Sequence, residues 1–404
     1  MKLKCRPEDF VVTELSEYPI RARGEWTVYE LTKRGIGTPE AITQLLQVWK
    51  IPRDRVSYGG LKDRHAVTTQ FVSVERGPAR NASRPLWDLR YLGQSDEAFR
   101  PADITGNRFR IVMRDMSLDE CQRATVALEE VRDAGLPNYF DDQRFGSVTA
   151  EGEFIGRAWI AGDFERALWL ALAAPAPHER ANEKREKAIL RKQWGHWTEC
   201  LNALGRSHRR SIVAYLKDHP QDFRGAFCRV RQDLRSLYLS AFQSHLWNQV
   251  LTAVIEAACP EVERAMVSLA LGPAPFFRRW DATETLDPAT LMVPLPASRT
   301  DYLDHEAMQL VTEQVLARHG LTLSDIKIKY PRDSFFSKGE RAAIVRPREL
   351  QFRVEGDTLY AGKHTVAMEL TLPRGAYATI LVKRITQAAA GVSLSLDGEE
   401  SVGD

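Results

Sequence analysis

The composition is that of an ordinary globular protein whose charges nearly balance. The 404 residues contain 56 Lys and Arg against 54 Asp and Glu, a formal net charge of +2, and 44% of them are hydrophobic. At this length a single hydrophobic core has usually stopped growing, so we expect two domains. The balanced charge neither requires nor excludes a polyanionic partner, which depends on whether the positive charges cluster.

Cysteine usage and the length of apolar runs argue against secreted, zinc-binding and membrane-spanning classes. The cysteines are scattered, with no Cys-x-x-Cys and no histidine at ligand spacing; they are Cys5, Cys121, Cys200, Cys228 and Cys259. This pattern indicates reduced thiols rather than disulfides or zinc ligands. No window approaches about 18 uninterrupted apolar residues, and the first residues do not form an apolar signal segment. We therefore expect a cytoplasmic protein without a membrane segment.

The first part of the chain alternates β-rich runs with a helical pattern. Residues 10–14 and 26–31 are predicted to be adjacent strands. In residues 38–50, Thr38 is expected to cap a helix and Pro39 to occupy its first position, with apolar residues repeating on one face. These elements favour a sheet-containing domain.

Residues 58–74 place charged side chains at the entry of an apolar strand. The successive glycines Gly59 and Gly60 are typical of a tight turn, because glycine adopts positive φ at little cost. After Asp63 and its basic neighbours the chain becomes apolar and β-branched, which predicts a strand. A carboxylate among cations keeps a low pKa and stays ionised, so Asp63 suits a nucleophile and not a general acid. The alternative is an aspartate that only caps a turn.

The next strand and helix have clear signals. Residues 108–114 alternate apolar with basic side chains, which predicts a strand with one face in the core and one positively charged face. The basic residues are Arg108, Arg110 and Arg114. A capping box of Ser117 and Glu120 starts a helix that Gly135 ends. Together these patterns predict an α+β domain, without fixing whether its strands are parallel.

From about residue 155 the pattern is mainly helical. A long buried helix is predicted over 233–256, with Leu237, Leu246, Val250 and Val254 inside. The stretch 326–346 is basic and loop-like.

Strands return near the end of the chain, at 350–355 and 364–371, whereas 377–385 fits either a strand or a helix. We therefore predict a discontinuous sheet domain of residues 1–155 plus 341–390, interrupted by a largely helical insert of residues 156–340. The Ser-, Gly- and acid-rich tail 391–404 is predicted to be disordered.

Three motifs in the same order along the chain resemble the tRNA pseudouridine synthase D family. They are Pro7-Glu8-Asp9-Phe10-Val11-Val12-Thr13-Glu14, Gly60-Leu61-Lys62-Asp63-Arg64-His65-Ala66-Val67-Thr68 and Pro137-Asn138-Tyr139-Phe140-Asp141-Asp142-Gln143-Arg144-Phe145-Gly146. The resemblance implies an α+β fold with a pseudouridine synthase-like mixed sheet, interrupted by a family-specific insertion domain. It covers most of the sheet domain and is thinner in the insert, where it rests on residues 236–244.

The resemblance also implies the reaction. Uridine of a tRNA, at position 13, would be isomerised to pseudouridine by an aspartate, with no cofactor and no metal. The bond between C1′ and N1 breaks, the uracil turns, and the ring rejoins C1′ through C5. Asp63 occupies the place of the catalytic aspartate, and the sequence leaves open whether it attacks C1′ or takes the C2′ proton. The implied partner is tRNA, with no membrane, and we expect a monomer.

Further site residues follow from the same resemblance. Phe10, Asn138 and Tyr377 match positions that line the uridine pocket, Phe140 would add an apolar wall, and Lys4 would pair with Asp63. The bacterial pattern has phenylalanine where this chain has Tyr377, whose hydroxyl needs a partner. The alternatives are core packing for Phe10 and Tyr377, a turn or cap role for Asn138, and a solvated side chain for Lys4. Candidates for phosphate contacts are Lys62, Arg64 and Arg144.

Three other functions are weighed against this one. A phosphate-binding loop is disfavoured because Asp63, not Ser or Thr, follows Lys62. A glycoside hydrolase needs a second carboxylate, and no spacing argument selects Asp141 or Asp142. A non-catalytic RNA-binding module would keep the basic and aromatic residues but would not need Asp63, so Asp63→Ala would leave its activity intact.

Overall fold

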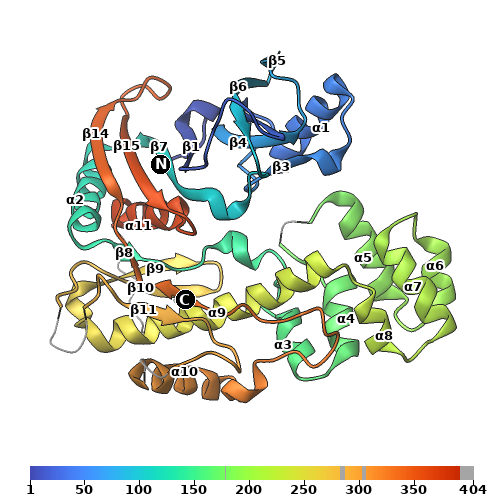
Figure 1. Cartoon of the computed structure of the whole chain (residues 1–404). Coiled ribbons are helices and arrows are strands. Elements are labelled where there is room, and N and C mark those ends of the chain that lie inside the picture. Colours follow the sequence, from blue (N-terminus) through green and yellow to red (C-terminus); the bar gives the residue numbers. More distant parts are fainter. Residues whose placement is uncertain (178, 283–286, 303–305, 392–404) are drawn as a thin grey trace. The chain divides into compact units, whose positions relative to one another are not determined.

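The computed structural model describes residues 1–177, 179–282, 287–302 and 306–391, and the chain divides into two compact units (Figure 1). Unit 1 comprises Met1–Leu136 and the chain from Val345 onward, and unit 2 comprises Pro137–Ile344. The sequence placed these boundaries near 155 and 341. Residues 137–155 fold with unit 2 because their groups bond there: the Tyr139 hydroxyl donates to the Pro275 carbonyl over 3.0 Å. Residues 392–404 of the predicted tail lie outside the described residues.

Unit 1 is built on one mixed sheet with the strand order β14-β15-β7-β1-β4-β2-β6-β5, and β3 also pairs with β4. In the described part of this sheet β1 and β4 run parallel, and the other neighbouring pairs are antiparallel. The strands are β1 Phe10–Ser16, β2 Trp26–Arg34, β3 Val56–Tyr58, β4 Val67–Glu75, β5 Ala82–Arg84, β6 Trp87–Ser95, β7 Ile104–Met116, β14 Arg348–Gly356 and β15 His364–Pro373. The prediction that the first two strands are neighbours is wrong, because β4 lies between them and pairs with both.

The α-helices in the described part of unit 1 are α1 Thr38–Trp49, α2 Leu118–Ala134 and α11 Ala378–Ala390. α1 packs on β2, β4 and β6 through a core that includes Ile42 and Leu45. Its cap is Gly37, not Thr38 as predicted. The segment that fitted either a strand or a helix is the helix α11, which lies beside α2, and α2 in turn packs against β14 and β15 (Figure 1). The Ser117 capping box is confirmed.

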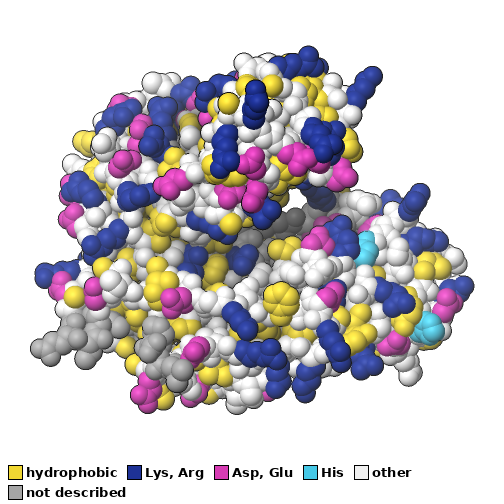
Figure 2. All heavy atoms as spheres, in the orientation of Figure 1, with side chains coloured by type: hydrophobic (Ala, Val, Ile, Leu, Met, Phe, Trp, Pro, Cys, Tyr) yellow, Lys and Arg dark blue, Asp and Glu magenta, His cyan; other side chains and the backbone are white. Residues whose placement is uncertain are grey.

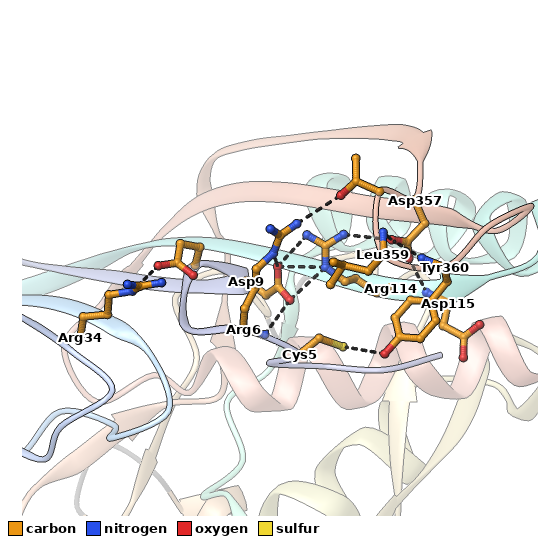
Figure 3. A network of polar contacts seen from close by, with 11 residues as sticks. Cys5, Arg6, Asp9, Arg34, Arg114, Asp115, Asp357, Leu359 and Tyr360 are labelled. Atoms are coloured by element: carbon orange, nitrogen blue, oxygen red, sulfur yellow. Dashed lines mark hydrogen bonds and ion pairs between the residues drawn. The ribbon is translucent and has the colours of Figure 1, made fainter.

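The strand β7 departs from its predicted charge pattern at one position. Arg108 and Arg110 are exposed, but Arg114 is only 6% exposed. Its guanidinium donates to both carboxylate oxygens of Asp9, over 2.8 to 3.0 Å, and to Oδ1 of Asp357 over 3.0 Å. Figure 3 shows this network, which joins the 3-10 helix η1 (Pro7–Asp9) to the turn after β14. The arginine is buried because two carboxylates neutralise it.

Unit 2 is mainly helical. Its helices are α3 Ile155–Ile160, α4 Phe164–Leu172, α5 Ala181–Lys192, α6 Trp197–Ala203, α7 His208–Asp218, α8 Phe223–Cys228, α9 Gln232–Ala258 and α10 Glu306–Arg318. The predicted long helix is α9, and its residues Leu246, Val250 and Val254 are buried. Leu237 is 51% exposed, so its predicted core position is wrong; it lies on the outer face of α9. The core of this unit includes Trp159, Phe227 and Phe242.

Two short antiparallel pairs of strands in unit 2 were not predicted. In one, β9 Arg264–Leu269 pairs with β10 Gly272–Phe277, and in the other, β11 Met292–Pro294 pairs with β12 Glu340–Ala342. The short strands β8 Leu136–Pro137 and β13 Ile344–Val345 pair where the chain passes between units. The short 3-10 helices are η2 Arg53–Arg55, η3 Pro101–Asp103, η4 Asp142–Phe145, η5 Glu261–Glu263 and η6 Leu323–Asp325. Every described helix is too short or too polar to cross a lipid bilayer.

Candidate active site

Asp63 and Lys4 form an ion pair in unit 1. Asp63 lies in the loop between β3 and β4, and the Lys4 ammonium bonds its Oδ2 atom from the segment ahead of β1. The backbone amide of His65 donates to the other carboxylate oxygen over 2.9 Å. The two side chains are 27% and 28% exposed, so the pair is partly screened from water but remains open on one side. The predicted pairing of Lys4 with Asp63 is present.

The geometry keeps Asp63 ionised. Burial alone raises the pKa of the Asp63 carboxyl, but the hydrogen bonds from Lys4 and from the His65 amide outweigh it and hold the pKa below the ordinary 3.8. At neutral pH the group is a carboxylate whose two oxygens are oriented by fixed donors. Such a group can act as a nucleophile or as a base toward a sugar carbon.

Lys4 is itself held in an unusual conformation. Its φ is 51°, in the left-handed region that residues other than glycine rarely adopt. The ammonium lies 4.4 Å from the centroid of the Phe10 ring. Phe10 is 7% exposed and makes an edge-to-face contact with Phe109, with ring centroids 6.2 Å apart. Lys4 is therefore fixed between an aromatic face and the Asp63 carboxylate, and strain of this kind is common at functional sites.

The loop that carries Asp63 is fixed by side chains from α1 and β4. The Thr38 hydroxyl donates to Gln70 over 2.8 Å and accepts the Lys62 amide over 3.0 Å, while the Gln70 amide donates to the Gly60 carbonyl over 3.0 Å. Neither glycine of the pair has the positive φ that was predicted. A Cβ on Gly59 would meet the Ile104 side chain at 2.5 Å and the Phe99 ring at 3.0 Å, so a larger residue there would require the Ile104 side chain to shift.

A buried lysine on β2 supports the same loop. Lys33 is fully buried, and its Nζ donates to the carbonyls of Ile36 (2.8 Å), Lys62 (3.2 Å) and Asp63 (2.6 Å). Burial lowers its pKa to about 8, with the Asp63 carboxylate opposing the shift. At neutral pH the group is thus an ammonium with one N–H for each carbonyl. Sequence reasoning missed Lys33, since nothing in a strand pattern distinguishes a buried lysine from a solvated one.

The predicted phosphate-binding residues have partners within their own units. Lys62 pairs with Glu14 over 2.7 Å and donates to Asn107 over 2.8 Å, and its side chain is only 11% exposed. Arg64 forms an exposed ion pair with Glu40. In unit 2, the Arg144 guanidinium lies 5.5 Å from the Phe140 ring centroid and donates to Ser244 over 3.2 Å. Lys62 therefore helps to hold its own loop in place through these contacts. Arg64 is the most solvent-exposed of the three side chains.

Asn138 and Phe140 lie in unit 2, immediately after β8. The Asn138 side chain donates to the Ala342 carbonyl over 2.9 Å and accepts from Arg341. The Arg341 guanidinium lies 4.3 Å from the Phe140 ring centroid, and Phe140 is 8% exposed. Asn248 bonds both the amide and the carbonyl of Phe140, each over 2.9 Å. Arg341 was missed from the sequence, where it appeared only as one cation of a basic stretch.

Tyr377 belongs to unit 1 and is half-buried at the N-terminal end of α11. Its carbonyl accepts the Ile380 amide over 3.1 Å, as expected at the start of a helix. The structure thus brings Lys4, Phe10 and Asp63 together in unit 1. It places Tyr377 at the beginning of α11 in the same unit, and Asn138 and Phe140 at the start of unit 2. Among the described residues, no group of three or more His, Cys, Asp or Glu side chains is arranged to hold a metal ion.

A pH profile tests the role of Lys4. Replacing Lys4 by Met removes the strongest donor that opposes burial, so the pKa of Asp63 rises. In the wild type Asp63 is protonated only as the pH falls through its lowered pKa, and in the variant it is protonated at a higher pH. We expect the acid limb of kcat/KM to move to higher pH and the rate at neutral pH to fall about tenfold, the scale of one lost hydrogen bond to a charged group.

The matched control for this profile is Lys2→Met, which removes an exposed lysine that pairs with Asp115 over 3.2 Å on the same N-terminal segment. It should leave both the rate and the acid limb where they are. Identical pH profiles for the Lys4 variant and the wild type, between about pH 4 and pH 8, would contradict the role given to Lys4.

Comparisons with known proteins agree with one another. The family model described as tRNA pseudouridine synthase D matches residues 1–385. A protein of Methanococcus maripaludis named "Probable tRNA pseudouridine synthase D 1" is 31% identical over 399 residues, which are 95% of this chain and 99% of that protein. The tRNA pseudouridine synthase D of Aquifex aeolicus is 27% identical, over 95% of this chain and 98% of its own.

A solved structure gives the same result. A crystal structure of a Methanosarcina mazei protein described as a tRNA pseudouridine synthase D matches with a TM-score of 0.71 and 26% identity, covering 95% of this chain and 94% of the other. The family model, which matches residues 1–385, includes the segment that carries Asp63.

Proposed function

The chain belongs to the tRNA pseudouridine synthase D family, and we propose that it isomerises a uridine of tRNA to pseudouridine with Asp63 as the catalytic carboxylate. Enzymes of this family are isomerases. The observation that carries the assignment of Asp63 is its pairing with Lys4, which keeps the carboxylate ionised beside the Phe10 ring. No observation favours the non-catalytic RNA-binding module.

The reaction needs little beyond that carboxylate and a sheltered site. The C1′–N1 bond breaks, the uracil turns, a C1′–C5 bond forms, and the proton lost from C5 is balanced by one gained at N1. No atom is oxidised or reduced overall, so no redox partner enters the balance. An ionised Asp63 serves either route, by attack at C1′ or by removal of the C2′ proton, and both require it to lie at the sugar.

The structure supports a specific role for Phe10. One face of its ring is covered by the Lys4 ammonium and its edge meets Phe109, so we propose that Phe10 both positions Lys4 and lines the uridine pocket. We propose Asn138, Phe140 and Tyr377 as the remaining walls of the uridine pocket. The Asn138 amide has two N–H groups and donates one to Ala342; we propose that the other, which has no acceptor among the described residues, binds a uracil or ribose oxygen.

A uridine in a folded tRNA must leave its stack to reach Asp63. That costs a few kcal/mol, which stacking against aromatic side chains and base-edge hydrogen bonds offset. We propose position 13 as the target, the sheet unit as the catalytic domain and unit 2 as the domain that selects the RNA. We also propose that the protein acts as a cytoplasmic monomer, without metal or cofactor.

The proposed function is tested with defined transcripts. The purified chain is incubated with tRNA transcripts in the presence of a chelator, and pseudouridine is mapped by chemical labelling and mass spectrometry. We expect one modified position, at uridine 13, with the same yield with and without the chelator. Bound but unmodified transcripts would contradict the proposal, and a second modified position would contradict the proposed specificity.

A further inference from the structure

An irregular segment of unit 2, residues 327–338, carries four basic side chains. It lies between η6 and β12 and contains Lys327, Lys329, Arg332 and Lys338, all exposed. None of these four makes an ion pair or a side-chain hydrogen bond with another residue in the described part of the chain. Its acidic residue, Asp333, is already neutralised by Arg235 through two bonds of 3.1 and 2.7 Å.

Two aromatic side chains of the same segment face solvent. Phe335 is 76% exposed and Tyr330 is 44% exposed, whereas the neighbouring Phe336 is only 6% exposed and belongs to the core of the unit. The exposure of Phe335 is therefore not the result of a loosely packed region. Leaving a phenylalanine in water forgoes about 2 kcal/mol of burial, so its position requires a reason outside folding.

The segment is fixed to the helices beneath it. The Trp159 indole donates to the Tyr330 carbonyl over 2.9 Å, and the Gln243 amide donates to the Ser337 carbonyl over 2.8 Å and accepts its N–H over 3.2 Å. Asp333 is held to α9 by Arg235, which is 4% exposed. These bonds fix the backbone on both sides of Phe335, so binding at its ring costs little backbone conformational entropy.

Further positive charge surrounds the segment. The Arg224 guanidinium lies 5.1 Å from the centroid of the Tyr330 ring. On this unit, Lys and Arg side chains gather near the end of α10 and near α3 (Figure 2). The neighbourhood therefore combines exposed aromatic rings with cations that form no direct ion pair with a described residue, although Asp325 lies near Lys327 and Lys329, on a chain whose total charge is only +2.

We propose that residues 327–338 bind an unpaired stretch of RNA, whose bases stack on Phe335 and Tyr330 while its phosphates meet Lys327, Lys329, Arg332 and Lys338. Aromatic rings interleaved with cations are the pattern that single-stranded nucleic acid requires, because every base has a stacking face and every nucleotide a negative charge. A duplex offers no free base face to Phe335. That the RNA is the tRNA substrate rests on the proposed function, but binding of unpaired RNA does not.

The main test replaces Phe335 by Ala and measures the dissociation constants for tRNA and for a mixed-sequence single-stranded RNA at fixed salt. We expect both to weaken about tenfold, the effect of losing one stacked base. The matched control is Val262→Ala, an equally exposed apolar residue of the same unit at 79%. Thermal unfolding of both variants should match the wild type. Unchanged RNA affinity of the Phe335 variant would overturn the proposal. That result is also the one expected if the surface binds another protein and not RNA.

A second test concerns charge. The double variant Lys329→Ala, Arg332→Ala should reduce the slope of log K against log salt by about 0.7 for each phosphate contact that is lost. The control removes the same charge from α5 through Lys184→Ala, Lys192→Ala, both exposed and without ion pairs among the described residues. Equal slopes for the two double variants would contradict phosphate contacts at this segment.

Kinetics separate this proposal from the catalytic one. Phe335→Ala should raise KM for tRNA with kcat unchanged, because stacking there is equal in the ground and transition states. If the wild type proves unable to form pseudouridine, the proposed function fails while the binding comparison still decides this inference. If turnover is present but Phe335→Ala leaves both KM and the dissociation constants unchanged, the inference fails and the proposed function stands.

Discussion

Replacing Asp63 by Asn is expected to reduce turnover by about a thousandfold or more while leaving the affinity for tRNA almost unchanged. Asparagine keeps the shape of the side chain and can still accept the His65 amide, but it cannot carry the charge that either route requires. The Lys4 ammonium loses its anionic partner and stays close to an amide oxygen. The measurement is kcat at saturating tRNA, compared with the dissociation constant from an equilibrium titration.

The matched control for this prediction is Asp54→Asn. Asp54 is an exposed aspartate in η2 of the same unit, and it has no ion pair with a described residue. It should change neither kcat nor affinity. Equal turnover of the Asp63 variant and the wild type would favour a different catalytic group, and a large loss of affinity would show that Asp63 acts chiefly in binding.

Replacing Arg114 by Ala should produce the largest loss of stability, about 3–5 kcal/mol in the free energy of unfolding. The carboxylates of Asp9 and Asp357 are almost fully buried, with side chains that are 1% and 0% exposed, and both lose their common cation. Because domains are stabilised by only about 5–15 kcal/mol, a considerable part of the native population would be lost at physiological temperature. Urea titration followed by circular dichroism measures this change.

The control lies on the same strand. Arg110 is 49% exposed and its contact with Glu369 is 3.7 Å long, so Arg110→Ala should change stability by less than about 1 kcal/mol. A similar loss for the two variants would contradict the account of Arg114. Since Asp9 immediately precedes Phe10, we also expect the Arg114 variant to lose activity at temperatures below its unfolding transition.

Lowering the pH should reduce the difference in the free energy of unfolding between the wild type and the Arg114 variant. Burial raises the pKa of Asp357, but hydrogen bonds from the Asp115 amide, other amides and Arg114 outweigh it and leave the pKa below the ordinary 3.8. A carboxyl with a lowered pKa in the folded state stabilises the fold above its ordinary pKa, and that contribution disappears as pH falls through the folded value. The wild type therefore loses the contribution of Asp357 to stability below about pH 4, where this carboxylate becomes protonated beside Arg114.

Local patterns predicted much of the fold. The Ser117 capping box, the helix ending at Gly135 and the strands β4, β7 and β15 follow from residues close together in the sequence. The β10 strand was missed because Pro273 and Pro275 argue against a strand, yet a two-stranded pair tolerates prolines on its outer side. Likewise, the sequence of α11 fits two structures, and its packing on α2 selects the helix.

Ion pairs between residues that are far apart in the sequence could not be predicted from local patterns. Arg114 sits in an alternating strand where a solvated face is the usual interpretation, and its partner Asp357 is 243 positions away. Lys33 is buried for a different reason, because three backbone carbonyls, one from the loop just after β2 and two from the Asp63 loop, meet at its ammonium. For the site, the family motifs predicted Asp63 and Lys4. The supporting residues Lys33, Thr38 and Arg341 have no local signal and emerge only from the folded arrangement.

The most direct measurement is a single-turnover experiment with enzyme in excess over labelled tRNA, comparing wild type, Asp63→Asn and Asp63→Glu after binding is complete. The account predicts that the wild type converts its bound uridine, that Asp63→Asn forms complex but no pseudouridine, and that the longer Asp63→Glu carboxylate restores at most a small fraction of the rate. Pseudouridine formed by the Asp63→Asn complex at the wild-type rate would contradict it.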